Sequence, residues 1–72
     1  MVNVNKLKGK IVENGFSIEE FADKIGIDRS TLYRKLSRKC ENLTIKEAEL
    51  MRSELNLSSV EAADIFFAQH VA

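Results

Sequence analysis

Apolar residues recur three and four positions apart along this chain, which is the repeat of an α-helix that buries one side. Val4, Leu7 and Ile11 form the first such stripe. Asn14-Gly15 is a typical helix end, so we expect a first helix over about residues 3–14. β-Strands would instead alternate every second residue, and the pattern therefore predicts an all-α chain.

Three serine or threonine residues are each followed three positions later by glutamate, which is the sequence signature of a capping box at a helix N-terminus. In this motif the hydroxyl and the carboxylate each accept a hydrogen bond from a backbone N–H group that the helix leaves without a partner. Helices are therefore expected to begin at these three places. The pairs are Ser17–Glu20, Thr44–Glu47 and Ser58–Glu61.

A further helix is predicted between the first two capping boxes. Gly26 ends the helix that Ser17 opens, and Asp28 is the expected N-cap of the next one. That helix covers about residues 29–37, with Leu32 and Leu36 facing inward, and a loop follows over residues 38–43.

The last two helices complete a compact five-helix chain. Asn56, which tolerates a left-handed conformation, is the expected end of the fourth. The fifth runs to about Phe67, and because Phe66 and Phe67 point about 100° apart, only one of them can face the core. The expected inward residues of the fourth helix are Ile45, Ala48, Met51 and Leu55.

Residues 17–38 combine the features that two helices need in order to cross over a tight turn. Ala22 is small enough for a close contact between the helices, and Gly26 can adopt the positive φ that the corner requires. Ile27 and Leu32 are expected to fill the angle between the two helices. The spacing predicts a helix-turn-helix unit over about residues 17–38.

The outward face of the second helix of this unit is rich in hydrogen-bond donors. If Leu32 and Leu36 face inward, Arg34 lies opposite the core. Arginine can donate two hydrogen bonds to guanine, hydroxyls can serve several bases, and flanking cations can neutralise phosphates, so this face is typical of a helix that enters the major groove. The helix carries no carboxylate, and its outward and flanking residues are Ser30, Thr31, Tyr33, Arg34, Lys35, Ser37 and Arg38.

The charges are unevenly distributed, although 11 basic and 11 acidic residues make the 72-residue chain neutral overall. Residues 1–40 hold nine basic and five acidic residues, whereas residues 41–72 hold two basic and six acidic ones. Residues 29–39 alone contain five basic residues and no acidic one. Such a dipolar chain can present a basic face to nucleic acid.

Length and composition argue against other functions. A chain of 72 residues is expected to form one domain, residues 1–72, whose small core leaves no room for a large substrate cavity. One cysteine, Cys40, and one histidine, His70, predict neither a disulfide nor a metal site. We expect neither a membrane span nor a signal peptide, because no apolar run approaches about 20 residues and no basic-then-apolar stretch follows Met1. We therefore expect a cytoplasmic protein that is not an enzyme and needs no cofactor, metal or small-molecule ligand.

Residues 3–67 resemble the lambda-repressor-like helix-turn-helix regulators of phages and bacteria. The run over residues 29–36 and the short length resemble the Cro-type phage repressors in particular, as does the ending Ile65-Phe66-Phe67 with Val71. The resemblance implies a sequence-specific transcriptional regulator that binds a pseudo-palindromic operator as a homodimer. In relatives the residue that opens the second helix is often a phosphate-binding glutamine, and here Ser17-Ile18 stands in its place.

The resemblance and the helix geometry together give the candidate site. The expected base-reading residues are Arg29, Ser30 and Arg34, with Tyr33 adjoining them. The expected contacts to the DNA backbone are Ser17, Thr31, Lys35, Ser37, Arg38 and Lys39. The expected dimer contacts are Phe66, Phe67 and Val71.

A second interpretation is a protein-binding module, such as an antitoxin or antirepressor, whose helix surface binds a partner protein. The acidic residues 41–72 would suit a basic partner. A small enzyme is a third interpretation, which the absence of any nucleophile–base pair disfavours.

Overall fold

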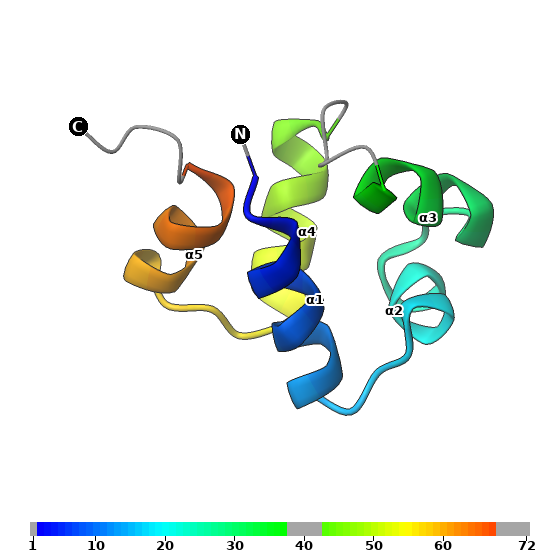
Figure 1. Ribbon diagram of the computed structural model, residues 1–72, viewed down its shortest axis with the longest axis horizontal. Coiled ribbons are helices and arrows are strands. Elements are labelled where there is room, and N and C mark those ends of the chain that lie inside the picture. The colour runs from blue at the N-terminus through cyan, green and yellow to red at the C-terminus, as the bar shows by residue number, and fades with distance from the viewer. Residues whose placement is uncertain (1, 38–42, 68–72) are drawn as a thin grey trace.

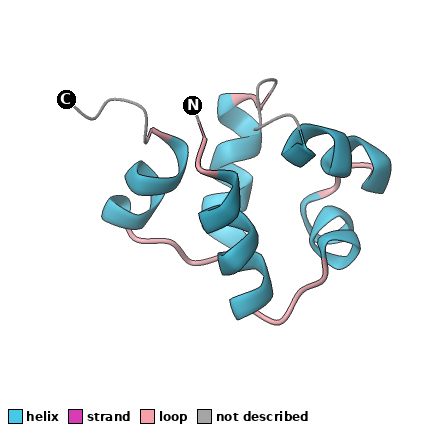
Figure 2. Ribbon diagram, viewed as in Figure 1, coloured by secondary structure: helices cyan, strands magenta, loops and turns pink. Residues whose placement is uncertain are grey.

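The computed structural model describes residues 2–37 and 43–67, and these residues form five helices without any strand (Figures 1 and 2). The prediction of an all-α chain with five helices is confirmed. None of the described helices is long and apolar enough to cross a membrane. The helices are α1 (Val4–Glu13), α2 (Ile18–Ile25), α3 (Arg29–Ser37), α4 (Ile45–Glu54) and α5 (Ser59–Phe66).

Local hydrogen bonds at the helix ends explain these boundaries. All three predicted capping boxes are present, with hydroxyl-to-backbone distances of 3.0–3.1 Å and carboxylate-to-backbone distances of 2.9–3.0 Å. Asn3 caps α1 by accepting a hydrogen bond from the backbone N–H of Lys6 at 3.1 Å. The two predicted left-handed ends are also confirmed, at Gly26 with φ 77° and at Asn56 with φ 54°.

The core lies between all five helices. α2 packs against α1, α3 and α4, and α5 packs against α1. Phe21 is fully buried and its ring lies 5.6 Å from that of Phe16. The buried apolar residues are Leu7, Ile11, Phe21, Ala22, Ile25, Leu32, Leu36, Met51, Leu55, Leu57, Ala62, Ile65 and Phe66.

The structure shows that Ile45, which was predicted to face the core, is exposed, and it shows which of Phe66 and Phe67 faces inward. Ile45 is 83% exposed, because at about 100° per residue it lies on the side of α4 that carries the exposed Glu49 and Arg52. Met51 and Leu55 are buried as expected. Of the adjacent phenylalanines, Phe66 belongs to the core and Phe67 is exposed, so only one of them faces inward.

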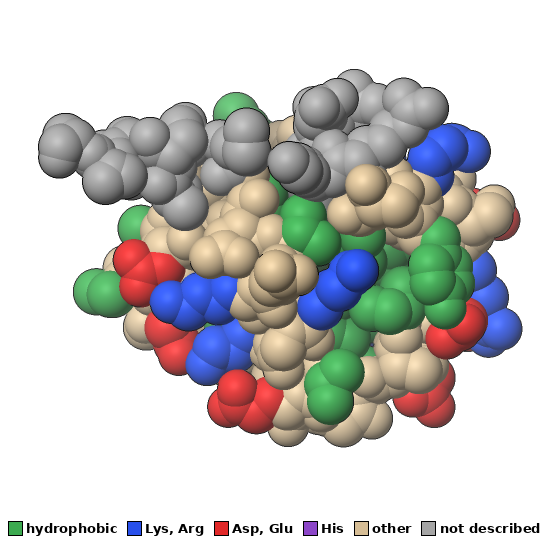
Figure 3. All heavy atoms as spheres, in the orientation of Figure 1, with side chains coloured by type: hydrophobic (Ala, Val, Ile, Leu, Met, Phe, Trp, Pro, Cys, Tyr) green, Lys and Arg blue, Asp and Glu red, His purple; other side chains and the backbone are tan. Residues whose placement is uncertain are grey.

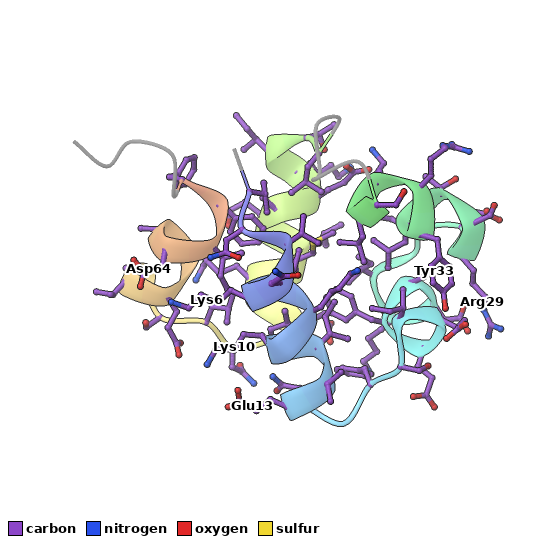
Figure 4. All side chains as sticks on the ribbon, in the orientation of Figure 1. Lys6, Lys10, Glu13, Arg29, Tyr33 and Asp64 are labelled. Atoms are coloured by element: carbon purple, nitrogen blue, oxygen red, sulfur yellow. The ribbon has the colours of Figure 1, made fainter. Side chains whose placement is uncertain are left out.

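Ion pairs join α1 to α5 along what we call the α1–α5 seam, formed by Lys6, Lys10, Glu61 and Asp64. Lys10 Nζ lies 2.8 Å from Glu61 Oε2, and Lys6 Nζ lies 3.4 Å from Asp64 Oδ2. Figure 4 shows Lys6 and Lys10 reaching from α1 toward α5, and in Figure 3 basic and acidic side chains adjoin on this side of the molecule. The bond to Lys10, before any other cause, lowers the pKa of Glu61 to about 2.

Candidate nucleic-acid interface

The helices α2 and α3 are joined by a link of only three residues, Gly26 to Asp28. The backbone N–H of Ile27 donates to the carbonyl of Ala22 at 2.9 Å, which holds the corner closed. Ala22 is fully buried, as a close contact between two helices requires. In Figure 1, α3 runs across the view while α2 is seen nearly end-on, so the two helices cross steeply.

The start of α3 is capped by Asp28, as predicted. Its Oδ2 accepts hydrogen bonds from the backbone N–H of Ser30 at 3.1 Å and of Thr31 at 3.3 Å. The Ser30 hydroxyl donates to the same oxygen at 2.6 Å. The bond from the Ser30 hydroxyl is the largest of the causes that lower the pKa of Asp28. The Ser30 hydroxyl can still accept a hydrogen bond from a DNA base.

Arg29 is held by a carboxylate of the preceding helix. Its Nε donates to Asp23 Oδ1 at 3.1 Å and its Nη2 donates to Asp23 Oδ2 at 2.5 Å. Both side chains remain more than half exposed, at 58% and 56%. The hydrogen bond lowers the pKa of Asp23, so this carboxylate stays ionised at neutral pH.

Tyr33 is held in the same way. Its hydroxyl donates to Glu19 Oε2 at 2.5 Å, and this bond raises the pKa of Tyr33 and lowers that of Glu19. Figure 4 shows Arg29 and Tyr33 together at the outer side of α2 and α3. Glu19, Asp23, Arg29 and Tyr33 form what we call the α2–α3 edge.

Glu19 and Asp23 were not among the residues singled out from the sequence. A signal for them exists, because the two carboxylates are four residues apart on α2 and their partners are four residues apart on α3. Side chains with that spacing lie on one side of each helix, so two contacts can form between the same two helices.

Lys35 does not lie free on the flank of α3. Its Nζ is 3.0 Å from Glu47 Oε1, and the two side chains are only 14% and 20% exposed. Glu47 also completes the capping box of α4, so this ion pair ties α3 to the start of α4. The sequence predicted that Lys35 lies on the flank of α3, but not that Glu47 faces it.

Arg34 differs from the other two cations of α3. It is exposed, and its side chain forms neither a hydrogen bond nor an ion pair with any residue in the described ranges. Leu32 and Leu36, on the opposite side of the helix, are buried, so the predicted outward direction of Arg34 is confirmed.

The remaining predicted site residues lie as follows. Ser17 uses its hydroxyl to cap α2, and the exposed Ser37 donates its hydroxyl to the carbonyl of Arg34 at 3.0 Å. Thr31 is half-buried. Arg38, Lys39 and Val71 lie outside the described residues. Within residues 2–37 and 43–67, no three His, Cys, Asp or Glu side chains are grouped so that they could hold a metal ion.

Comparisons of this chain with protein-family models, with curated proteins and with solved structures find no match.

Proposed function

We propose that this protein is a sequence-specific DNA-binding regulator of transcription, in which α2 and α3 form a helix-turn-helix unit and α3 enters the major groove. The exposed, acid-free side of α3, with Arg34 at its centre, carries the proposal. α3 has α2 as its main neighbour and buries only its Leu32 and Leu36 side. A major groove about 12 Å wide accepts a helix of about 10–12 Å diameter.

The base-reading residues in this proposal are Arg29, Ser30 and Arg34, with Tyr33 beside them. The two arginines suit guanine, whose O6 and N7 accept two parallel hydrogen bonds. Contacts to phosphate are assigned to Ser17, Thr31, Ser37, Arg38 and Lys39. We assign none to Lys35, because its side chain is only 14% exposed and its ammonium group is paired with Glu47.

The proposal places two copies of the protein on a pseudo-palindromic operator, where they act as a Cro-like repressor by occupying the promoter. Val60 and Phe67, at the two ends of α5, are 71% and 59% exposed and offer apolar surface for a contact between copies. Phe66 is assigned no such contact, because it is part of the core. The symmetry of the selected DNA site tests the stoichiometry.

Selection of bound duplexes from a random-sequence DNA library, followed by a salt titration on the selected duplex, tests the proposal. If a dimer neutralises at least about six phosphates, the slope of log K against log salt is expected to be about −5 or steeper. Arg34→Ala is expected to relax the preference at one base pair, whereas Arg52→Ala, which removes the same charge from the end of α4, leaves the selected site unchanged. A wild-type protein that enriches no duplex contradicts the proposal and favours a protein partner instead.

A further inference from the structure

Two carboxylates of α2 hold two exposed side chains of α3. Asp23 binds the Arg29 guanidinium through two hydrogen bonds, and Glu19 accepts one from Tyr33. Ion pairs as exposed as that of Asp23 and Arg29 contribute little to stability, because water and salt screen them. The pair therefore needs an explanation other than holding the two helices together, which the buried apolar residues already do.

The geometry of this pair leaves half of the guanidinium available. A guanidinium has five N–H donors in one plane. Asp23 takes the Nε–H and one hydrogen of Nη2, which form one side of the group. Both hydrogens of Nη1 and the second hydrogen of Nη2 remain, and these form the fork that matches O6 and N7 of guanine.

A fixed arginine recognises a base better than a mobile one. Ordering a flexible side chain on binding reduces affinity, so a side chain that is already oriented in the free protein avoids that loss. A carboxylate at the same place also repels phosphate, which weakens binding to every duplex alike. Asp23 and the neighbouring Glu19 thus favour discrimination between sequences over general affinity.

Resting on the function proposed above, we propose that Asp23 is a positioning residue that sets sequence specificity by presenting the free fork of Arg29 to one base pair of the operator. Asp23 itself contacts no base. Its effect on specificity passes through Arg29 and is lost when Arg29 is absent.

The test compares variants on the duplex selected by the wild-type protein and on a scrambled duplex of the same length. Discrimination is the ratio of the two dissociation constants. Asp23→Ala is expected to lower it roughly 2- to 12-fold, the effect of having to order one flexible side chain on binding, because Arg29 itself is still present. Asp64→Ala is the matched control, because it removes one exposed, ion-paired carboxylate from α5 and so makes the same change in net charge. Far-UV circular dichroism checks that each variant is folded.

A second set of variants separates positioning from a general effect of charge. Repeating the selection with Asp23→Ala and with Arg29→Ala is expected to relax the preference at the same base pair. The double variant is expected to discriminate no worse than Arg29→Ala alone, because Asp23 has nothing left to position.

Two outcomes overturn the inference. Asp23→Ala can bind both duplexes more tightly with unchanged discrimination, which would make Asp23 only a repulsive charge. It can also lower discrimination further in the absence of Arg29, which would give it a separate role. Both outcomes leave the proposed function intact, whereas a wild-type protein that selects no duplex removes the function itself.

Discussion

The α1–α5 seam and the α2–α3 edge both pair donors of one helix with carboxylates of another, but the donors differ. In the seam, Lys10 and Glu61 are 21% and 39% exposed and Glu61 also caps α5, whereas Lys6 and Asp64 are 44% and 55% exposed. At the edge, Arg29 and Asp23 are both more than half exposed. Lysine is a compact charge, whereas a guanidinium can serve two partners at once. The comparison teaches that the Lys10–Glu61 pair can only join the two helices, while the Arg29–Asp23 pair leaves guanidinium donors available for a second partner.

The largest expected effect concerns the apolar contact beneath the edge. Leu32→Ala removes a fully buried side chain and is expected to destabilise the protein by about 2–5 kcal/mol. A domain of this size has a total stability of about 3–5 kcal/mol, so the variant is expected to be largely unfolded. Thermal or urea unfolding followed by circular dichroism measures this. A decrease in the free energy of unfolding of less than about 1 kcal/mol would show that the apolar contacts do not hold the edge together.

Arg34→Ala sharpens the comparison from the functional side. Its side chain is exposed and forms neither a hydrogen bond nor an ion pair with the described residues, so the free energy of unfolding is expected to change by less than about 0.5 kcal/mol. Binding to the selected duplex is expected to weaken by about 1–3 kcal/mol, measured by fluorescence anisotropy. Equal losses in stability and in binding would contradict the assignment of Arg34 to the interface.

The capping serines offer one matched substitution in each region. Ser17→Ala removes the N-cap of α2, and Ser58→Ala removes the N-cap of α5. Each substitution is expected to lower the free energy of unfolding by about 1 kcal/mol. Only Ser17→Ala is expected to weaken DNA binding as well, because the N-terminus of α2 belongs to the proposed interface. If both variants bind the selected duplex equally well, the start of α2 makes no contact with phosphate.

The smallest expected effect is the pH dependence of the seam. The pKa of Glu61 is about 2 in the folded protein and lies below its ordinary value, mainly because of Lys10. Its ionised form therefore stabilises the fold above about pH 4.5, and this stabilisation is lost as the pH falls toward 2. Glu61→Gln is expected to remove this dependence of the free energy of unfolding on pH between about 2 and 4.5, and Lys10→Met is expected to reduce it. Unfolding curves recorded between pH 2 and 6 measure the change, and unaltered slopes in both variants would exclude the seam as its source.

Much of the helical framework could be predicted, because its signals act over a few residues. A capping box spans four positions and satisfies the same backbone groups wherever the helix lies, so all three appear as expected. Asn56 and Gly26 likewise reach positive φ for reasons contained in the residues themselves. Ile45 shows that a spacing of three or four is not enough, since at about 100° per residue it falls on the exposed side of α4 with Glu49 and Arg52.

The candidate site was predicted only in part. The outward direction of Arg34 follows from the helical repeat, and the structure agrees. The partners of Arg29, Tyr33 and Lys35 could not be read in the same way, because each comes from another helix. Their carboxylates lie between six and 14 residues away along the chain.

The amino-acid order alone therefore determined where the helices begin and end, and which side of α3 turns away from the core, since caps and the 3.6-residue repeat depend on near neighbours. Only the packing of the helices decided which cations of α3 are already paired and which remains available. An ion pair between helices forms only when the crossing brings two side chains within about 4 Å, and no spacing along the chain specifies that crossing.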